Sequence, residues 1–227
     1  MNRDSNSYTI IYASVMVVLV AVVLAFTSQS LRSYQKTNED NDKRQQILRS
    51  INVQATPGEA ETKYNELIRD AYLVNEKGEK TEGDAFEADA AKSFAEHKYP
   101  VFIANINGQE KYIMAMQGSG LWGPLWGYIA LDDDKNTVFG ADFSHAGETP
   151  GLGAEISATD FSGKFSGKKI FREGEFKSIA IVKPGKSAIG QDYVDGISGG
   201  TITSQGVDRM IFDSLSAYVS FLTSKNQ

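Results

Sequence analysis

The segment VFIANINGQEKYIMAMQ, residues 101–117, places Asn107 and Gly108 between two alternating runs of β-branched and aromatic residues. Asn-Gly is a dipeptide strongly favoured in two-residue hairpin turns. The pattern therefore predicts a β-hairpin with strands at 101–106 and 111–117. Similar runs between turn-forming residues predict three more strands. These are 128–131, 137–143 and 176–182.

Helical patterns flank these strands. Apolar residues three and four positions apart predict helices at 60–74 and 86–97, and an amphipathic run begins at Gln46. After Ser204 a single apolar stripe predicts a long C-terminal helix. Its members are Val207, Met210, Ile211, Leu215, Tyr218, Val219 and Leu222. We therefore expect one α+β domain over 46–227, with an antiparallel sheet and flanking helices.

The N-terminal segment TIIYASVMVVLVAVVLAF contains no charged residue. About 20 apolar residues are enough for a helix to cross the ~30 Å hydrocarbon core of a bilayer. We expect a transmembrane helix at 8–27, after a tail at 1–7 and before a polar tether at 28–45. A cleaved signal peptide is the alternative, but its apolar stretch is usually only ~7 to 15 residues long.

The charges beside this helix bear on its orientation. Arg3 precedes the helix, and a larger group of basic residues follows it. These are Arg32, Lys36, Lys43 and Arg44. The positive-inside rule, read by itself, places the large domain in the cytoplasm, although the rule is weak for short tails of few charges.

The composition excludes several classes of protein. With 23 Lys and Arg against 29 Asp and Glu, the net charge of -6 argues against nucleic-acid binding. The chain has no cysteine, so disulfides, zinc-thiolate sites, iron–sulfur ligation and thiol catalysis are excluded. The two histidines, His97 and His145, are too few for a multi-histidine metal site. The acidic run Asp132–Asp134 is interpreted as a charged turn, so no metal site is predicted. Redox chemistry would therefore require an organic cofactor.

The segment DGISGGTITSQGVDRMI, residues 195–211, joins a turn to the expected C-terminal helix. Gly199 and Gly200 precede Thr201, which stands just before the expected helix start. Unpaired backbone N–H groups and the helix dipole favour an anion there, so a phosphate ester on Thr201 would be stabilised. Asp195 is placed to accept a proton or to help hold a metal while such a bond is formed.

An ordinary turn also explains this segment. In that interpretation Thr203 or Ser204 caps the helix and the two glycines only shape the turn. A Walker-type phosphate loop is not supported, because no lysine follows the glycines. A hydrolase triad of His145, Ser198 and Asp195 lacks a GxSxG nucleophile elbow. The spacing therefore leaves the ordinary turn and the phosphate site open.

Three segments resemble the FMN-binding domain family. Residues Ser198 to Thr201 resemble its flavinylation motif, Ser/Thr-Gly-Ala-Thr preceded by Asp, with Gly200 where the family usually has Ala. The segments 147–153, GETPGLG, and 120–123, GLWG, resemble two further loops of the family. In that family a flavin transferase moves FMN from FAD onto the last threonine of the motif. The resemblance therefore implies FMN held covalently by a phosphodiester to Thr201.

The resemblance and the side-chain chemistry together predict the other flavin contacts. An isoalloxazine ring needs an apolar wall, for which Leu121 and Trp122 are suited, and Lys183 is able to neutralise the phosphodiester. The competing interpretations are core packing for the tryptophan and solvent exposure for the lysine. The full set of predicted cofactor-binding residues is Asp195, Ser198, Gly199, Gly200, Thr203, Leu121, Trp122, Glu148, Thr149, Leu152, Gly153 and Lys183.

The resemblance covers essentially the whole chain and implies a role in respiration. It points to the flavin-carrying subunits of sodium-translocating NADH:quinone reductases, which relay electrons from NADH towards quinone while sodium is exported. The implied partners are the other subunits of that membrane complex and the flavin transferase. The implied location is the bacterial inner membrane, with the flavin domain on the periplasmic or outer side. Two alternatives stay open: an Rnf-type ferredoxin:NAD complex, and an anchored extracytoplasmic binding module without a redox group.

Overall fold

The structure is a computed structural model that describes residues 6–224. The chain divides into two units between Asp42 and Lys43. The first unit consists of most of α1, Asn6–Ser50, and its apolar span is not buried within the protein. Among the described residues, α1 is the helix whose length and composition suit a membrane span. The segment 28–45, expected to be a tether, continues the same helix, and Arg3 lies outside the described residues.

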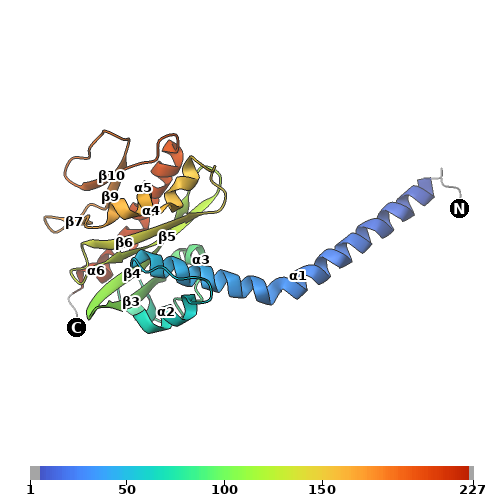
Figure 1. The fold of residues 1–227 in the computed structure, drawn as a ribbon, viewed down its shortest axis with the longest axis horizontal. Coiled ribbons are helices and arrows are strands. Elements are labelled where there is room, and N and C mark those ends of the chain that lie inside the picture. Colours follow the sequence, from blue (N-terminus) through green and yellow to red (C-terminus); the bar gives the residue numbers. More distant parts are fainter. Residues whose placement is uncertain (1–5, 225–227) are drawn as a thin grey trace. The chain divides into compact units, whose positions relative to one another are not determined.

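The second unit is built on a six-stranded antiparallel sheet with the order β2-β1-β3-β4-β5-β6 (Figure 1). Its strands are β1 Ile68–Val74, β2 Lys80–Thr81, β3 Tyr99–Ile106, β4 Gln109–Ser119, β5 Pro124–Leu131 and β6 Val138–His145. The predicted hairpin is present as β3 and β4. Asn107 and Gly108 have φ values of 52° and 84°, the positive values that a type I′ turn requires at both central residues.

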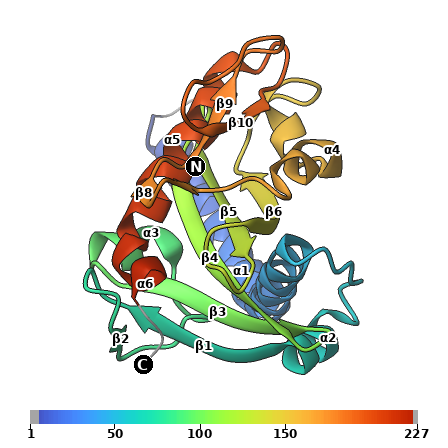
Figure 2. The same cartoon turned by 90° about the vertical axis from the view of Figure 1, so that its left-hand side faces the viewer.

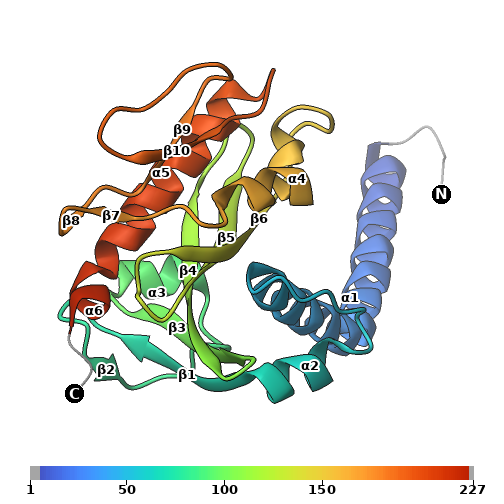
Figure 3. The same cartoon turned by 60° about the vertical axis from the view of Figure 1, so that its left-hand side comes forward.

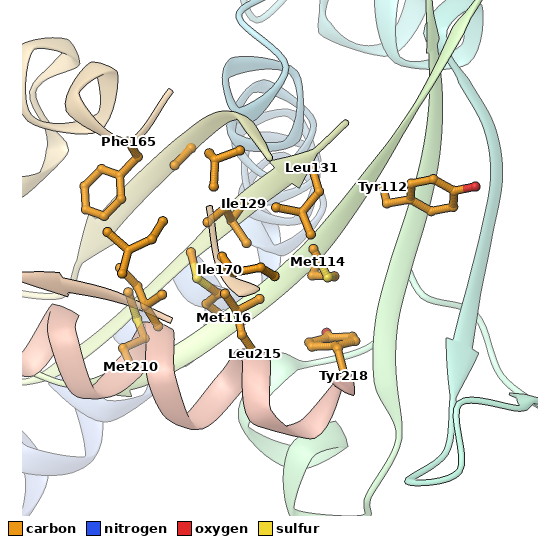
Figure 4. Close-up of a cluster of buried hydrophobic side chains, with 14 of the residues drawn as sticks. Tyr112, Met114, Met116, Ile129, Leu131, Phe165, Ile170, Met210, Leu215 and Tyr218 are labelled. Carbon is orange, nitrogen blue, oxygen red and sulfur yellow. The ribbon is translucent and has the colours of Figure 1, made fainter. Parts of the chain in front are cut away.

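Both faces of the sheet are buried, because alternate residues of each strand enter different cores. On β4, Met114 and Met116 face the helix α5, Thr201–Ala217, as Figure 4 shows. Ile113 and Ala115 face the opposite core, which contains the end of α1 and part of α2, Ala60–Leu67. Figure 3 shows α5 and α2 on opposite sides of the sheet. The α+β class with an antiparallel sheet and flanking helices is thus confirmed.

The remaining elements complete the second unit. They are α3 Ala90–Ala95, η1 Gly153–Ser157, α4 Thr159–Ser162, η2 Gly163–Phe165, β7 Phe171–Arg172, β8 Glu175–Phe176, β9 Ile179–Val182, β10 Asp192–Asp195 and α6 Val219–Thr223. Strands β9 and β10 form a small parallel sheet, which lies beside α5 and separate from the main sheet (Figure 2). Helix α5 contacts both sheets.

Three local predictions were wrong. The helix predicted at 60–74 ends at Leu67, and strand β1 follows it. A bulge between Ile68 and Asp70 places Ile68 on the same face of the sheet as Ala71 and Leu73. The apolar residues are therefore spaced as they would be in a helix, which explains the wrong prediction. The helix predicted at 86–97 is limited to α3, whose first turn is capped by Asp89. The strand predicted at 176–182 is broken at Ser178, whose φ is 62°.

Candidate functional site

Helix α5 begins at Thr201, with Gly200 as the N-cap residue. Neither Thr203 nor Ser204 caps the helix, so the ordinary-turn interpretation was wrong about the helix start. Gly200 has φ -103° and ψ 39°, and no side chain of the described residues accepts from the N–H groups of this end. The side chain of Thr201 is exposed. The structure therefore places an accessible hydroxyl directly at an uncapped helix N-terminus, where a phosphate is stabilised.

Hydroxyl groups of the first turn of α5 connect it to neighbouring loops. Ser204 Oγ accepts a hydrogen bond of 2.9 Å from the amide of Ile197, which closes the turn before the helix. Thr203 Oγ1 donates a hydrogen bond of 2.5 Å to Glu148 Oε2. The helix approaches β4 closely at Gly206, where a Cβ atom would lie 2.5 Å from the main-chain oxygen of Ser119. The start of α5 is thereby held against the 120–123 turn and the 147–153 loop.

Glu148 lies at the centre of these contacts and is 4% exposed. Its Oε1 accepts a 2.9 Å hydrogen bond from the amide of Trp122. Burial by itself would raise the pKa of Glu148, but the hydrogen bonds from Thr203, Trp122 and Leu121 outweigh it, so the pKa is lowered. Glu148 is therefore an ionised carboxylate whose two oxygens both have partners within the protein.

A cavity of about 230 Å³ lies beside Thr201. Its lining residues are Leu121, Glu148, Thr149, Leu152, Gly153, Gly199, Gly200, Thr201, Ile202 and Thr203. All of them except Ile202 were predicted from the sequence. Leu121, Leu152 and Ile202 are each more than two-fifths exposed, which is unusual for large apolar side chains around one cavity. The structure thus combines an anion-binding helix end with an apolar rim.

Four predicted residues do not line the cavity. Trp122 is 67% exposed and contributes its amide to Glu148. Asp195 is the last residue of β10, and its main-chain oxygen accepts a 3.3 Å hydrogen bond from Lys164. Lys183 is exposed and follows Val182, which pairs with Asp195, so the two residues lie at the same end of the small sheet. Ser198 is exposed in the turn before α5.

Sequence reasoning missed Ile202 and Gly206, and it considered Ser204 only as a possible cap of the helix. Ile202 adds to the apolar rim, and the sequence contained no signal for it, because its exposure is visible only in the structure. No sequence signal pointed to Ser204 or Gly206 as more than helix residues. Their roles depend on the neighbouring turn at Ile197 and on the end of β4.

Comparisons with known proteins agree with this geometry. The model of the FMN-binding domain family matches residues 120–216. The NqrC subunit of the Na(+)-translocating NADH-quinone reductase of Vibrio anguillarum is 31% identical over an alignment that covers 91% of this chain and 89% of the relative. The crystal structure of the same subunit from Parabacteroides distasonis is 73% identical, with a TM-score of 0.85, and the match covers 86% of this chain and 98% of that chain. The chain belongs to the NqrC family of Na(+)-translocating NADH-quinone reductases.

The crystal structure of Shewanella oneidensis NqrC, 23% identical with a TM-score of 0.69, supports the same fold. The match to the FMN-binding family runs from the turn before β5 to the end of α5 and includes every residue of the cavity. Of the alternatives left open by the sequence, the comparisons favour the NADH-quinone reductase. As a member of the NqrC family, the chain is part of a multi-subunit oxidoreductase complex and carries an FMN-binding domain, and α1 fits a single membrane span.

Proposed function

We propose that this subunit is a membrane-anchored electron carrier that holds FMN through a phosphodiester to Thr201 Oγ1. In this role it relays electrons from NADH towards quinone within the complex, and the relay is coupled to sodium export. One observation carries the proposal: the exposed hydroxyl of Thr201 stands at the uncapped start of α5, beside a cavity with an apolar rim. When bound, the flavin supplies the capacity to accept and donate electrons.

The residues at the cavity fit the parts of FMN. The backbone N–H groups at the start of α5 suit the phosphate, because they are uncapped and lie at the positive end of the helix dipole. Leu121, Leu152 and Ile202 provide apolar surface for the ring. Thr149 supplies a hydroxyl at the same cavity. Lys183 and Asp195, at the neighbouring end of the small sheet, are proposed to act on the phosphate and on its transfer.

The size of the cavity gives covalent attachment a physical reason. Pockets that retain a small molecule by contacts are usually ~300 to 1,000 Å³ and bury most of the ligand surface. The cavity at Thr201, at about 230 Å³, is smaller than that range. A flavin held only by contacts would be lost by mass action on dilution, whereas a covalent bond fixes its occupancy. The exposed part of the ring would remain available to electron-transfer partners.

Attachment needs a second protein, for which we propose a flavin transferase that uses FAD. Thr201 Oγ1 forms a bond to the phosphorus of the FMN half, the pyrophosphate bond breaks, AMP leaves, and the hydroxyl proton passes to a base of the transferase. The accessibility of Thr201 supports attack by its hydroxyl inside another enzyme's active site.

The intact mass of the full chain in detergent, after incubation with transferase and FAD, tests the attachment. Wild type and Thr201→Ser are expected to gain the mass of FMN less water, and Thr201→Val, which keeps the shape and lacks the hydroxyl, is expected to gain none. Thr223→Val makes the same change on an exposed threonine of α6 and serves as the matched control. A flavin retained by Thr201→Val would refute the attachment site.

We also propose that the flavin domain lies on the periplasmic side of the inner membrane. The family resemblance supports this side, and the basic residues after the apolar span of α1 oppose it. Alkaline phosphatase, which is active only outside the cytoplasm, and a cytoplasm-specific reporter are to be fused in parallel after the C-terminal residue. Activity of the phosphatase fusion is expected, and activity confined to the cytoplasmic reporter would reverse the proposed orientation.

A further inference from the structure

Among the described residues that line the cavity, Glu148 is the one that carries a charge. It joins three segments that are distant in sequence: the amide of Trp122 donates to its Oε1, and Thr203 donates to its Oε2 from the first turn of α5. Hydrogen bonds to an ionised group are about twice as strong as neutral ones. A single side chain therefore connects the elements that surround Thr201.

The surroundings of Glu148 are shaped to admit its carboxylate. A Cβ atom at Gly120 would collide with Glu148 Oε1, and a Cβ atom at Gly153 would lie 2.6 Å from Oε2. The same atom at Gly153 would also collide with the Thr203 hydroxyl. Two glycines thus leave space for the bridge between Glu148 and Thr203, one on each side of the carboxylate.

We infer that Glu148 is a positioning residue, which assembles the flavin site before FMN is attached and supplies a fixed negative charge that lowers the reduction potential of the bound flavin. The inference rests on the proposed attachment of FMN to Thr201. It assigns Glu148 a different role from direct contact with the flavin, because both of its oxygens already accept hydrogen bonds from the protein.

The first effect is the assembly of the flavin site before FMN is attached. Leu121 and Thr201 stand on separate segments. Leu121 is connected to the carboxylate through the amide of its neighbour Trp122, and Thr201 through Thr203 in the same helical turn. A site held in this way is organised without the cofactor. Preorganisation reduces the ordering that attachment would otherwise require.

The second effect is electrostatic. Glu148 lies within the protein and lines the cavity, so water screens its charge less than it screens a surface carboxylate. A nearby negative charge disfavours the addition of an electron to the ring. Removal of the charge should therefore make the flavin easier to reduce and shift its midpoint potential to a more positive value.

Hydrogen–deuterium exchange of the full chain in detergent, before any flavin is attached, tests the assembly of the site. In Glu148→Ala, the amide of Trp122 loses its acceptor and should exchange about tenfold faster or more, while the β3–β4 hairpin should be unchanged. Thr203→Val keeps the carboxylate and removes the link to α5, so faster exchange should appear chiefly at the start of that helix. If the amides of the 120–123 turn exchange at the same rate in Glu148→Ala as in wild type, the assembling role of Glu148 is overturned.

The midpoint potential of flavinylated Glu148→Gln tests the charge. The glutamine oxygen is able to accept from the amide of Trp122 and its nitrogen to donate to Thr203, so the shape of the site is kept while the charge is removed. Glu155→Gln is the matched control, because Glu155 is an exposed carboxylate whose Oε1 accepts from the amide of Gly151 in the same loop without lining the cavity. The midpoint potential of the flavin should rise in Glu148→Gln, and this rise should be several times larger than any shift in Glu155→Gln.

The outcomes separate this inference from the proposed function. Wild-type protein that takes up no flavin would refute the attachment, and the exchange experiment would still decide the assembling role. Flavinylated wild type with equal potentials in Glu148→Gln and Glu155→Gln would refute the electrostatic role and leave the attachment intact. A lower melting temperature in Glu148→Gln without a change of midpoint potential would likewise refute the electrostatic role, and the exchange experiment would decide the assembling role.

Discussion

Arg49 and Asp142 form a two-armed ion pair, with Arg49 Nε 2.7 Å from Asp142 Oδ1 and Nη2 3.0 Å from Oδ2. The pair joins the last turn of α1 to β6, the edge strand of the main sheet. The side chain of Asp142 is 7% exposed, whereas that of Arg49 is 32% exposed. The end of α1 is therefore part of the folded flavin domain. Asp142 depends more on the ion pair than Arg49 does, because its charge is less exposed to water.

The two partners are expected to respond unequally to substitution. Arg49→Met leaves a buried carboxylate without this partner and should lower the free energy of unfolding by roughly 2 kcal/mol, less than the 3–5 kcal/mol typical of a fully buried pair. Asp142→Asn leaves a partly exposed guanidinium that water can solvate, and should have a smaller effect. Urea unfolding followed by circular dichroism measures the free energy of unfolding of both variants. Equal decreases would contradict the explanation that the more deeply buried partner depends more on the pair.

Alanine substitutions at Gly199 and at Gly200 are expected to have different effects on stability and on flavinylation. Gly199 has a φ of 78°, and a Cβ atom would lie 2.6 Å from Leu152 Cδ2, so Gly199→Ala should destabilise the protein by about 1–2 kcal/mol and slow flavinylation several-fold. At Gly200 φ is negative, and a Cβ atom would approach Ile197 at 3.2 Å and Gly153 at 3.3 Å, which an adjustment of a few tenths of an ångström relieves. Gly200→Ala should therefore be flavinylated at about the wild-type rate.

The time course of intact mass with transferase in excess measures this difference. Melting temperatures separate a folding defect from a recognition defect. If Gly200→Ala were not flavinylated while Gly199→Ala were flavinylated at the wild-type rate, the result would contradict the explanation that the packing of the turn before α5 controls access to Thr201.

The hairpin and the site threonine were predictable because their signals are local. Asn107 and Gly108 specify the turn through their own backbone preferences, whatever the rest of the chain does. In the same way, the resemblance of the turn before α5 to a known motif singled out Thr201 as the attachment site, which stays a prediction. Most residues of the cavity followed, since each loop that lines it resembles a segment of the family.

What the sequence did not show depends on contacts between distant segments. The bulge in β1 appears only when Ile68 is paired with Ala104 of β3, and without that pairing the spacing of apolar residues resembles a helix. The bond between Glu148 and Thr203 spans 55 positions. Glu148 was therefore predicted only as a cofactor-binding residue, and its use as an internal bridge became visible only in the folded chain.

Tyr218 is expected to stabilise the core through its hydroxyl. The side chain is fully buried, and its hydroxyl lies 2.8 Å from the main-chain oxygen of Pro100 and 3.2 Å from that of Ala115. Tyr218→Phe removes the donor and leaves buried oxygens with fewer partners, so the free energy of unfolding should fall by about 1–2 kcal/mol. Tyr34→Phe, on the exposed part of α1, is the control and should have no measurable effect. Equal stability of the two variants would show that the buried hydroxyl contributes nothing.

The lowered pKa of Glu148 predicts how stability depends on pH. The ordinary pKa of a glutamate is 4.5, and hydrogen bonds from Thr203 and the amides of Trp122 and Leu121 hold the folded value below it despite burial. A group whose pKa is lower in the folded state stabilises the fold fully above its unfolded pKa, and the contribution is lost as the pH falls through the folded pKa. The advantage of wild type over Glu148→Gln should thus be constant near neutral pH and shrink below about pH 4.5.

The difference between the two proteins is the quantity to measure, because the other titrating groups contribute to both and largely cancel. Urea unfolding followed by the fluorescence of the tryptophans, at several values between about pH 3 and pH 7, gives the difference in free energy directly. A difference that grows as the pH falls would mean that the folded pKa is raised. In that case burial would outweigh the hydrogen bonds, and Glu148 could not be the ionised bridge between the 120–123 turn and α5.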